Sequence, residues 1–231
     1  MSGRTLPFLP ELAFALGVAG LATATAAQDL LPSPPLAANV EALPRVSGDT
    51  AIARQLNATL QLLDDQDFQS VTCDEEDSEF ASRTVKVLSD GPEFLSFLVS
   101  SGGACDGANY PFSETQMLNF DLETGSQTDL MQLLPDGWAE GPGANAPDDD
   151  RVLSLYLEMA SEEIRAQCRD TLEGPVTFEF GIDGKGDRLV ILPDGLLNNE
   201  LGCETAVYVP VDRLAKAGFD RRLIDALSQE N

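Results

Sequence analysis

The side chains that could do chemistry in this chain are carboxylates and cysteines, because the sequence has 39 acidic residues, four cysteines and no histidine. Without histidine there is no Ser-His-Asp triad, no Cys-His pair and no HExxH zinc site. No G-x-S-x-G, Walker or G-x-G-x-x-G motif is present either. A glycosidase needs only two acids, about 5 to 9 Å apart, whose pKa values differ. Asp106 and Asp121 are the pair we nominate for such chemistry.

The segment around these two acids has an unusual composition. Residues 105–111 concentrate Gly, Asn and Pro between two apolar strands, and residues 119–125 follow closely. A disulfide-anchored turn and the end of a hairpin would explain this composition structurally. A direct binding role is the alternative. The residues that would form such a site are Asp106, Gly107, Ala108, Asn109, Tyr110 and Asp121.

The sequence favours neither a metal site nor a cofactor. No two cysteines stand at C-x-x-C spacing, and no histidine completes a zinc set. The turn over residues 183–187 has an acid at each end, but it lacks the third acid and the distal Glu of an EF-hand loop. Lys185 stands where a calcium ligand would be needed. We therefore expect no metal and no cofactor.

The N-terminus predicts export. Residues 1–27 carry one arginine, an apolar stretch from Leu12 to Leu21 and small residues ending in Ala26-Ala27, which is the pattern of a secretory signal peptide. The apolar stretch is shorter than the roughly 20 residues that a membrane-spanning helix needs. After cleavage behind Ala26 or Ala27, we expect a periplasmic or secreted protein without a membrane anchor.

Export determines how the cysteines are interpreted. In an oxidising compartment four cysteines most simply form two disulfides, for which three connectivities exist. We favour Cys73 with Cys105 and Cys168 with Cys203, because each pair is closer in sequence than its alternatives. Closing two loops of about 30 residues would stabilise the fold by roughly 3 to 4 kcal/mol each.

The charge of the chain limits its partners. The formal net charge is −25, and the leader holds one acid and one base, so cleavage leaves this value unchanged. Such a charge disfavours nucleic acid and anionic membrane surfaces and favours cationic partners. Taken alone, the charge is better explained by solubility in a salty exterior. With 43% hydrophobic residues, the chain is nevertheless expected to fold around a core.

Hydrophobic periodicity predicts an α+β fold for residues 40–231, behind a Pro-rich linker at 28–39 that should be an extended tether. A Gly/Pro-rich stretch at 137–147 indicates a surface loop or a junction between two halves. We expect helices at 49–64, 148–169 and 220–227, a helical turn at 130–134, and antiparallel strands at 85–87, 94–100, 115–122, 176–182, 188–192 and 205–209.

Two details of this prediction concern acidic residues. Asp49 is a good N-cap for the first helix, since its carboxylate can accept hydrogen bonds from the first N–H groups. That helix should end near Asp64. Residues 64–79 are then expected to form a loop that carries charges of one sign.

Short motifs along the chain resemble a known family. LPRVSG at 43–48, followed by QLN at 55–57, resembles the start of the extracytoplasmic region shared by RsiV-type anti-sigma factors and PdaC-type peptidoglycan deacetylases. DGAN at 106–109, before DLETG at 121–125, is similar to that family's GGAH segment and D-L-x-T-G motif. VPV at 209–211 with Leu214 resembles its closing strand and helix. The resemblance covers about residues 43–227, and Asn109 stands where the family has histidine.

The resemblance implies an α+β module outside the cytoplasm. In RsiV-type proteins this region binds lysozyme, whereas PdaC-type proteins carry their deacetylase chemistry in a separate domain, for which this chain has no room. The leading hypothesis is therefore a secreted or periplasmic, non-enzymatic binding domain for a cationic protein such as lysozyme. The alternatives are an envelope carbohydrate-active enzyme that uses Asp106 and Asp121, and a structural component of the envelope.

Overall fold

The structure is a computed structural model that describes most of the chain from Asp29 onward. The described residues are 29–71, 78–105, 112–135, 138, 151–174, 176–196 and 200–228. The predicted leader at 1–27 and residues 139–147 of the predicted junction lie outside them. No helix in the described ranges is long and apolar enough to cross a membrane.

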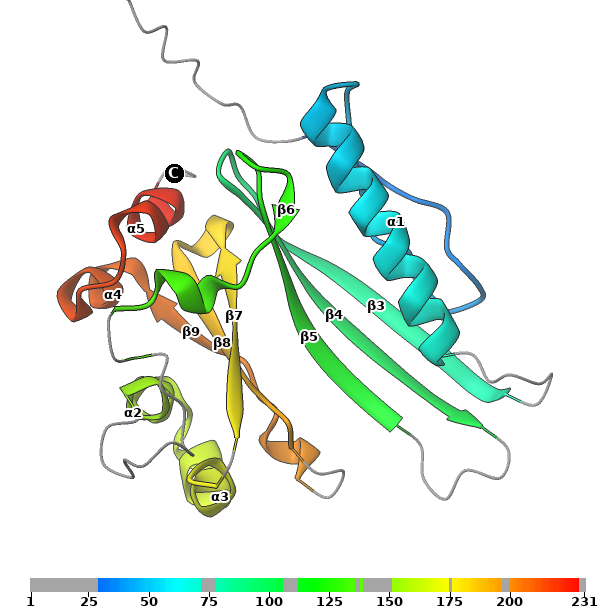
Figure 1. Ribbon diagram of the computed structural model, residues 1–231. Coiled ribbons are helices and arrows are strands. Elements are labelled where there is room, and N and C mark those ends of the chain that lie inside the picture. Colours follow the sequence, from blue (N-terminus) through cyan, green and yellow to red (C-terminus); the bar gives the residue numbers. More distant parts are fainter. Residues whose placement is uncertain are drawn as a thin grey trace, which may run out of the picture.

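The described chain has the predicted α+β class, with antiparallel sheets of two, four and three strands. Figure 1 shows the arrangement as successive layers. One long helix covers the four-stranded sheet, the three-stranded sheet lies on the other side of that sheet, and a group of shorter helices covers the three-stranded sheet. Two main hydrophobic cores result, one under the long helix and one under the shorter helices.

The first core joins helix α1 (Ala51–Val71) to the four-stranded sheet of order β3-β4-β5-β6. Because side chains alternate across a strand, every second residue of a strand faces the helix. The strands are β3 (Ser78–Asp90), β4 (Phe94–Cys105), β5 (Phe112–Asp121) and β6 (Ser126–Gln127). The buried residues of this core include Leu56, Leu60, Leu95, Phe97, Val99, Leu118 and Phe120.

Helix α1 differs from its prediction at both ends. The sequence predicts Asp49 as its cap, but Ala53 N donates to Thr50 Oγ1 at 3.0 Å, so Thr50 caps the helix. The helix also continues past Asp64 to Val71. Asp64 and Asp67 therefore lie on the helix and not in a solvated acidic loop. Residues 72–77 of the predicted loop lie outside the described chain.

The predicted tether at 28–39 is packed against the domain over its described part. Strand β1 (Leu30–Leu31) pairs with β2 (Arg45–Val46), and Ser47 N donates to Asp29 O. Leu30 packs against the first core, which explains why this proline-rich segment does not remain free. Leu31 beside it stays 53% exposed, and the segment ends in a turn at Ala38 and Asn39.

A buried arginine ties three parts of this half together. The Arg83 side chain is fully buried, and its Nη1 donates to Asp64 Oδ1 at 2.7 Å and to Glu41 O at 2.8 Å. Its Nη2 lies 2.8 Å from Asp67 Oδ2. Asp64 is equally buried and accepts a bond from Leu43 N at 3.0 Å. Since a buried charge requires a partner, this network fixes the N-terminal segment, α1 and β3 relative to one another.

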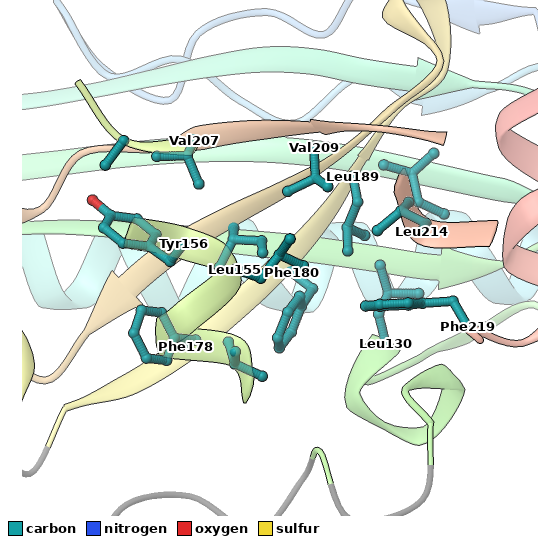
Figure 2. Close-up of a cluster of buried hydrophobic side chains, with 14 of the residues drawn as sticks. Leu130, Leu155, Tyr156, Phe178, Phe180, Leu189, Val207, Val209, Leu214 and Phe219 are labelled. Carbon is teal, nitrogen blue, oxygen red and sulfur yellow. The ribbon is translucent and has the colours of Figure 1, made fainter. Parts of the chain in front are cut away.

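The second core joins the three-stranded sheet of order β7-β8-β9 to helices and short turns. The strands are β7 (Thr177–Asp183), β8 (Arg188–Asp194) and β9 (Val207–Pro210). The helices are α2 (Arg151–Met159), α3 (Glu162–Leu172), α4 (Val211–Ala217) and α5 (Arg221–Ser228), and the 3-10 turns are η1 (Leu130–Leu133), η2 (Gly184–Gly186) and η3 (Leu201–Cys203). Figure 2 shows Tyr156 of α2 near Phe178 of β7, with Phe180, Leu189 and Val209 along the same face.

The predicted helix at 148–169 is two helices in the described chain. Helix α2 ends at Met159, and α3 begins after Ser161, whose hydroxyl accepts a bond from Ile164 N at 3.2 Å. The apolar spacing continues through Ala160, so periodicity alone did not reveal the serine cap. Helix α4 was also absent from the prediction by periodicity, because its seven residues are too few to show a helical period, and only the resemblance at Leu214 implied a helix there.

The disulfide between Cys168 and Cys203 is confirmed. It joins α3 to η3, with the two Cα atoms 5.5 Å apart. Such a bond is compatible with an oxidising compartment. Cys73 and the side chain of Cys105 lie outside the described residues, so their pairing stays a prediction.

Replacing Asp64 with alanine should strongly destabilise the protein, because the Arg83 charge would remain buried without its closest partner. We expect a loss of about 3 to 5 kcal/mol in the free energy of unfolding, measured by urea denaturation. The matched control is Asp65→Ala, an exposed position on the same helix, which should change stability by less than about 1 kcal/mol. Equal and small losses for both variants would contradict the role given to Asp64.

Candidate functional site

The two larger sheets meet where β7 crosses the face of β4 and β5. A Cβ atom on Gly181 would lie 2.8 Å from Met117 Sδ and 3.1 Å from Leu88 Cδ1, so only glycine permits this approach without a shift. Met117 and Leu88 form a small apolar cluster between the sheets with Val190 and Leu192. The contact therefore fixes where the edge of β7 lies relative to β5.

Buried polar side chains complete this contact. The Ser96 hydroxyl donates to Asn119 Oδ1 at 2.7 Å, and Asn119 Nδ2 donates to Phe180 O at 2.6 Å. Ile182 N in turn donates to Ser96 Oγ at 3.1 Å. Ser96 and Asn119 are both buried, so these bonds give the backbone of β7 partners from the other sheet.

A cleft of about 470 Å³ lies beside this contact, along the N-terminal half of β7. It is within the size range of small-molecule sites in proteins. Its walls come from β5, β7, the end of β8 and the segment that joins β6 to η1. The described residues that line it are Met117, Asn119, Gln127, Thr128, Asp129, Met131, Thr177, Phe178, Glu179, Phe180 and Asp194.

Two carboxylates next to the cleft bind the outer backbone of β5. Met117 N donates to Glu179 Oε2 at 2.6 Å. The backbone N–H and the hydroxyl of Thr115 donate to the Glu204 carboxylate. Both N–H groups lie on the side of β5 away from β4, where no strand of the described ranges pairs with them. The two carboxylates thus accept the hydrogen bonds that a neighbouring strand would otherwise accept from these N–H groups of β5.

Burial raises the pKa of Glu179 to about 7, against an ordinary value of 4.5. The hydrogen bond from Met117 N opposes this rise, while the carboxylates of Asp194, Glu114 and Glu204 add to it by repulsion. The pKa of Glu204 is also raised, first by burial and then by Asp194 and Glu114. Four acids from β5, β7, β8 and the η3–β9 connection therefore repel one another at this place.

No lysine or arginine stands among the described residues that line the cleft. The described acids do not converge closely enough to form a metal-binding group. A cationic group that entered the cleft would be attracted by Glu179, Asp194 and Asp129 together. Because the cleft is partly shielded from water, such an attraction is stronger there than on an open surface.

The residues that the sequence nominated for binding divide into two groups. Asp106, Gly107, Ala108, Asn109 and Tyr110 lie outside the described chain, so their role stays a prediction. Asp121 is described, and it lies at the other end of β5 from Phe112, about 30 Å away at about 3.3 Å per residue. The loop leaves and re-enters the sheet near the opposite end, where Cys105 pairs with Ser78 and Phe112 pairs with Gly103.

Asp121 has a structural role in the described chain. Arg222 Nη1 lies 2.8 Å from its Oδ2, and its Oδ1 accepts bonds from Glu123 N at 2.8 Å and Thr124 N at 3.0 Å. Burial alone would raise the pKa of Asp121, but these partners lower it below the ordinary value. The aspartate therefore holds the turn after β5 and fixes α5 to it, which does not favour a catalytic role.

The acids of the cleft were missed because they come from four separate segments. Glu179, Asp194 and Glu204 are far apart in sequence and meet only through the register of β7 and β8 and the course of the chain before β9. One local indication existed. Glu179 stands between Phe178 and Phe180 in a strand that is otherwise mostly apolar.

Comparisons with known proteins give no family for this chain. No family model matches it, and no curated protein matches it. Among solved structures, a DUF3298 family protein from Pseudomonas aeruginosa PAO1 matches at 12% identity with a TM-score of 0.39, over 62% of this chain and 63% of that one. The matched region is thus less than two thirds of that structure's length. At this identity and TM-score, the likeness establishes neither a shared fold nor a shared function.

Replacing Glu179 with glutamine should stabilise the protein in a pH-dependent way. A carboxyl whose pKa rises on folding contributes stability below about pH 4.5 and loses it as the pH rises through about 7. Glutamine cannot ionise, and its carbonyl can still accept the bond from Met117 N. The free energy of unfolding of the variant should exceed that of wild type by an amount that grows by about 1 to 2 kcal/mol between pH 5 and pH 8. This is less than the full pKa shift would give, because the side chain is only half-buried and water screens its charge.

Thermal and urea unfolding at the two pH values would measure this gain. Glu162→Gln on α3 is the matched control, because Glu162 is exposed and should give the same small difference at both values. A gain for Glu179→Gln that does not change with pH would contradict the raised pKa.

Proposed function

We propose that this chain is a non-enzymatic binding domain that acts in the periplasm or outside the cell and takes a cationic protein as its partner. The observation that carries this proposal is the group of mutually repelling carboxylates at the cleft between β5 and β7. These carboxylates have no basic side chain among the described lining residues. A lysine or arginine from a partner would relieve the repulsion that the folded domain maintains.

The wider features of the chain support the same kind of partner. A net charge of −25 accelerates encounter with a basic protein, although charge alone gives steering more than specificity. The Cys168–Cys203 disulfide is compatible with an oxidising compartment. Lysozyme is the first partner to test, because the sequence motifs resemble the RsiV-type region and lysozyme is strongly basic.

Calorimetric titration with lysozyme at pH 8, at low and at moderate salt, tests the proposal. We expect binding that survives moderate salt in part, and a loss of about tenfold or more in affinity for the double variant Glu179→Gln/Asp194→Asn. The matched control is Glu162→Gln/Asp170→Asn, which removes the same charge from exposed positions on α3. The control should bind like wild type.

Three results would count against this proposal. Absence of binding at low salt would remove lysozyme as the partner. Weak binding that moderate salt abolishes would mean general charge attraction. Equal losses for the cleft variant and the control would mean that the cleft is not the site.

One observation favours a second function, a carbohydrate-active enzyme that uses paired carboxylates. A raised pKa beside another carboxylate is the pattern of a general acid with its partner. In the β7–β8 register Asp194 pairs with Thr177, so it is a diagonal neighbour of Glu179, with backbones about 7 to 8 Å apart. Release of reducing ends from purified peptidoglycan, lost in Glu179→Gln and retained in Glu162→Gln, would support this function over the binding one.

A further inference from the structure

The free edge of β7 faces the cleft, and the strand register shows which of its backbone groups point outward. In an antiparallel ladder, residues alternate between pairs that exchange hydrogen bonds and pairs that do not. Phe178 pairs with Pro193, which has no N–H to give, so Phe178 belongs to a non-bonded pair. By alternation, Phe180 and Ile182 also belong to non-bonded pairs. The N–H and C=O groups of all three residues therefore point away from β8.

The bonds between the sheets agree with this assignment. Asn119 donates to Phe180 O, and Ile182 N donates to Ser96, so both groups lie on the outer side of β7. The outward N–H and C=O of Phe178 and the outward N–H of Phe180 have no hydrogen-bond partner among the described residues. Phe178 and Phe180 are only 8% and 3% exposed. Backbone groups of such buried residues require a partner, and these three lie where β7 lines the cleft.

We propose that this edge accepts a short extended segment of a partner as an added strand, with a lysine or arginine opposite Glu179. The inference rests on the proposed function and specifies how the partner is held. Strand addition uses main-chain bonds for affinity and alternate side chains for specificity. The available edge is short, because Phe180 O and Ile182 N are already bonded, so only about four residues from Thr177 to Phe180 can pair.

The two faces of the edge define the sequence of the partner. A residue of the added strand that lies opposite Glu179 has its side chain on the Glu179 face, the face on which Asp194 of β8 also lies. Its two neighbours lie opposite Phe178 and Phe180, on the face of the second core, where Met131 also lines the cleft. The fitting segment therefore has a basic residue between two apolar ones, in extended conformation.

A synthetic peptide, acetyl-Lys-Val-Lys-Val-Lys-amide, tests this inference with the full chain. With a lysine opposite Glu179, the two valines lie opposite Phe178 and Phe180. The valine at Phe178 exchanges two bonds with it, and the valine at Phe180 accepts one bond from the Phe180 N–H, because Phe180 O is already bonded to Asn119. The lysine N–H groups point away from β7. An analogue N-methylated on both valines should bind at least tenfold more weakly in calorimetry. An analogue N-methylated on two lysines has the same charge and the same number of methyl groups, and it should bind like the parent.

Hydrogen exchange of the Phe178 and Phe180 amides gives the second measurement. Both should exchange fast in the free chain and slow on addition of the parent peptide, and the effect should weaken in Glu179→Gln/Asp194→Asn. Absence of peptide binding, equal binding of the two analogues, or slow exchange of both amides in the free chain would each overturn strand addition. If lysozyme binding still depends on the cleft acids in those cases, the proposed function stands and only its mode is wrong.

Discussion

The structure depends on the close contact between β7 and the β4-β5 pair. Gly181 removes the side chain that would otherwise separate the sheets, and Ser96 and Asn119 supply hydrogen bonds to the β7 backbone. These bonds use the C-terminal half of the outer edge of β7. Its N-terminal half is left beside a cleft, and Glu179 reaches from it to the backbone of β5. The same contact that joins the two halves therefore creates the candidate site.

The buried acidic groups of the two halves have different surroundings. In the first half, the buried Arg83 and Asp64 neutralise each other, and that network serves stability. At the cleft, Glu179 and Glu204 bind backbone N–H groups without any lysine or arginine among the described lining residues. Most acids of this chain are explained by solvation, but a half-buried carboxylate with neighbours of the same sign is not. This contrast is the physical reason for placing a cationic partner at the cleft.

Much of the fold could be predicted from local patterns. The run at 94–100 was recognisable as a buried strand, the hairpin around residues 183–187 was recognisable from its turn, and the pairing of Cys168 with Cys203 followed from sequence distance. Features that depend on one side chain were harder. Thr50 rather than Asp49 caps α1, and Ser161 divides a periodic segment into two helices.

The candidate site could not be predicted because its acids meet through tertiary structure. No spacing in the sequence relates Glu204 to Thr115, or Glu179 to Met117. The sequence drew attention to Asp121 through its motif, and the structure shows that Arg222 and two backbone N–H groups hold that side chain. The net charge favours a cationic partner, and the place proposed for that partner depends on the cleft and on the strand register, which the sequence does not reveal.

Carbon NMR of the Glu179 carboxyl, titrated with pH in the free chain and in the presence of lysozyme, tests the central claim most directly. In the free chain the carboxyl should titrate near pH 7, because burial and neighbouring acids disfavour its charge. With the partner bound, the midpoint should fall, because a cation in the cleft favours the ionised form. A midpoint near 4.5 in the free chain, or a raised midpoint that the bound partner leaves unchanged, would contradict the account.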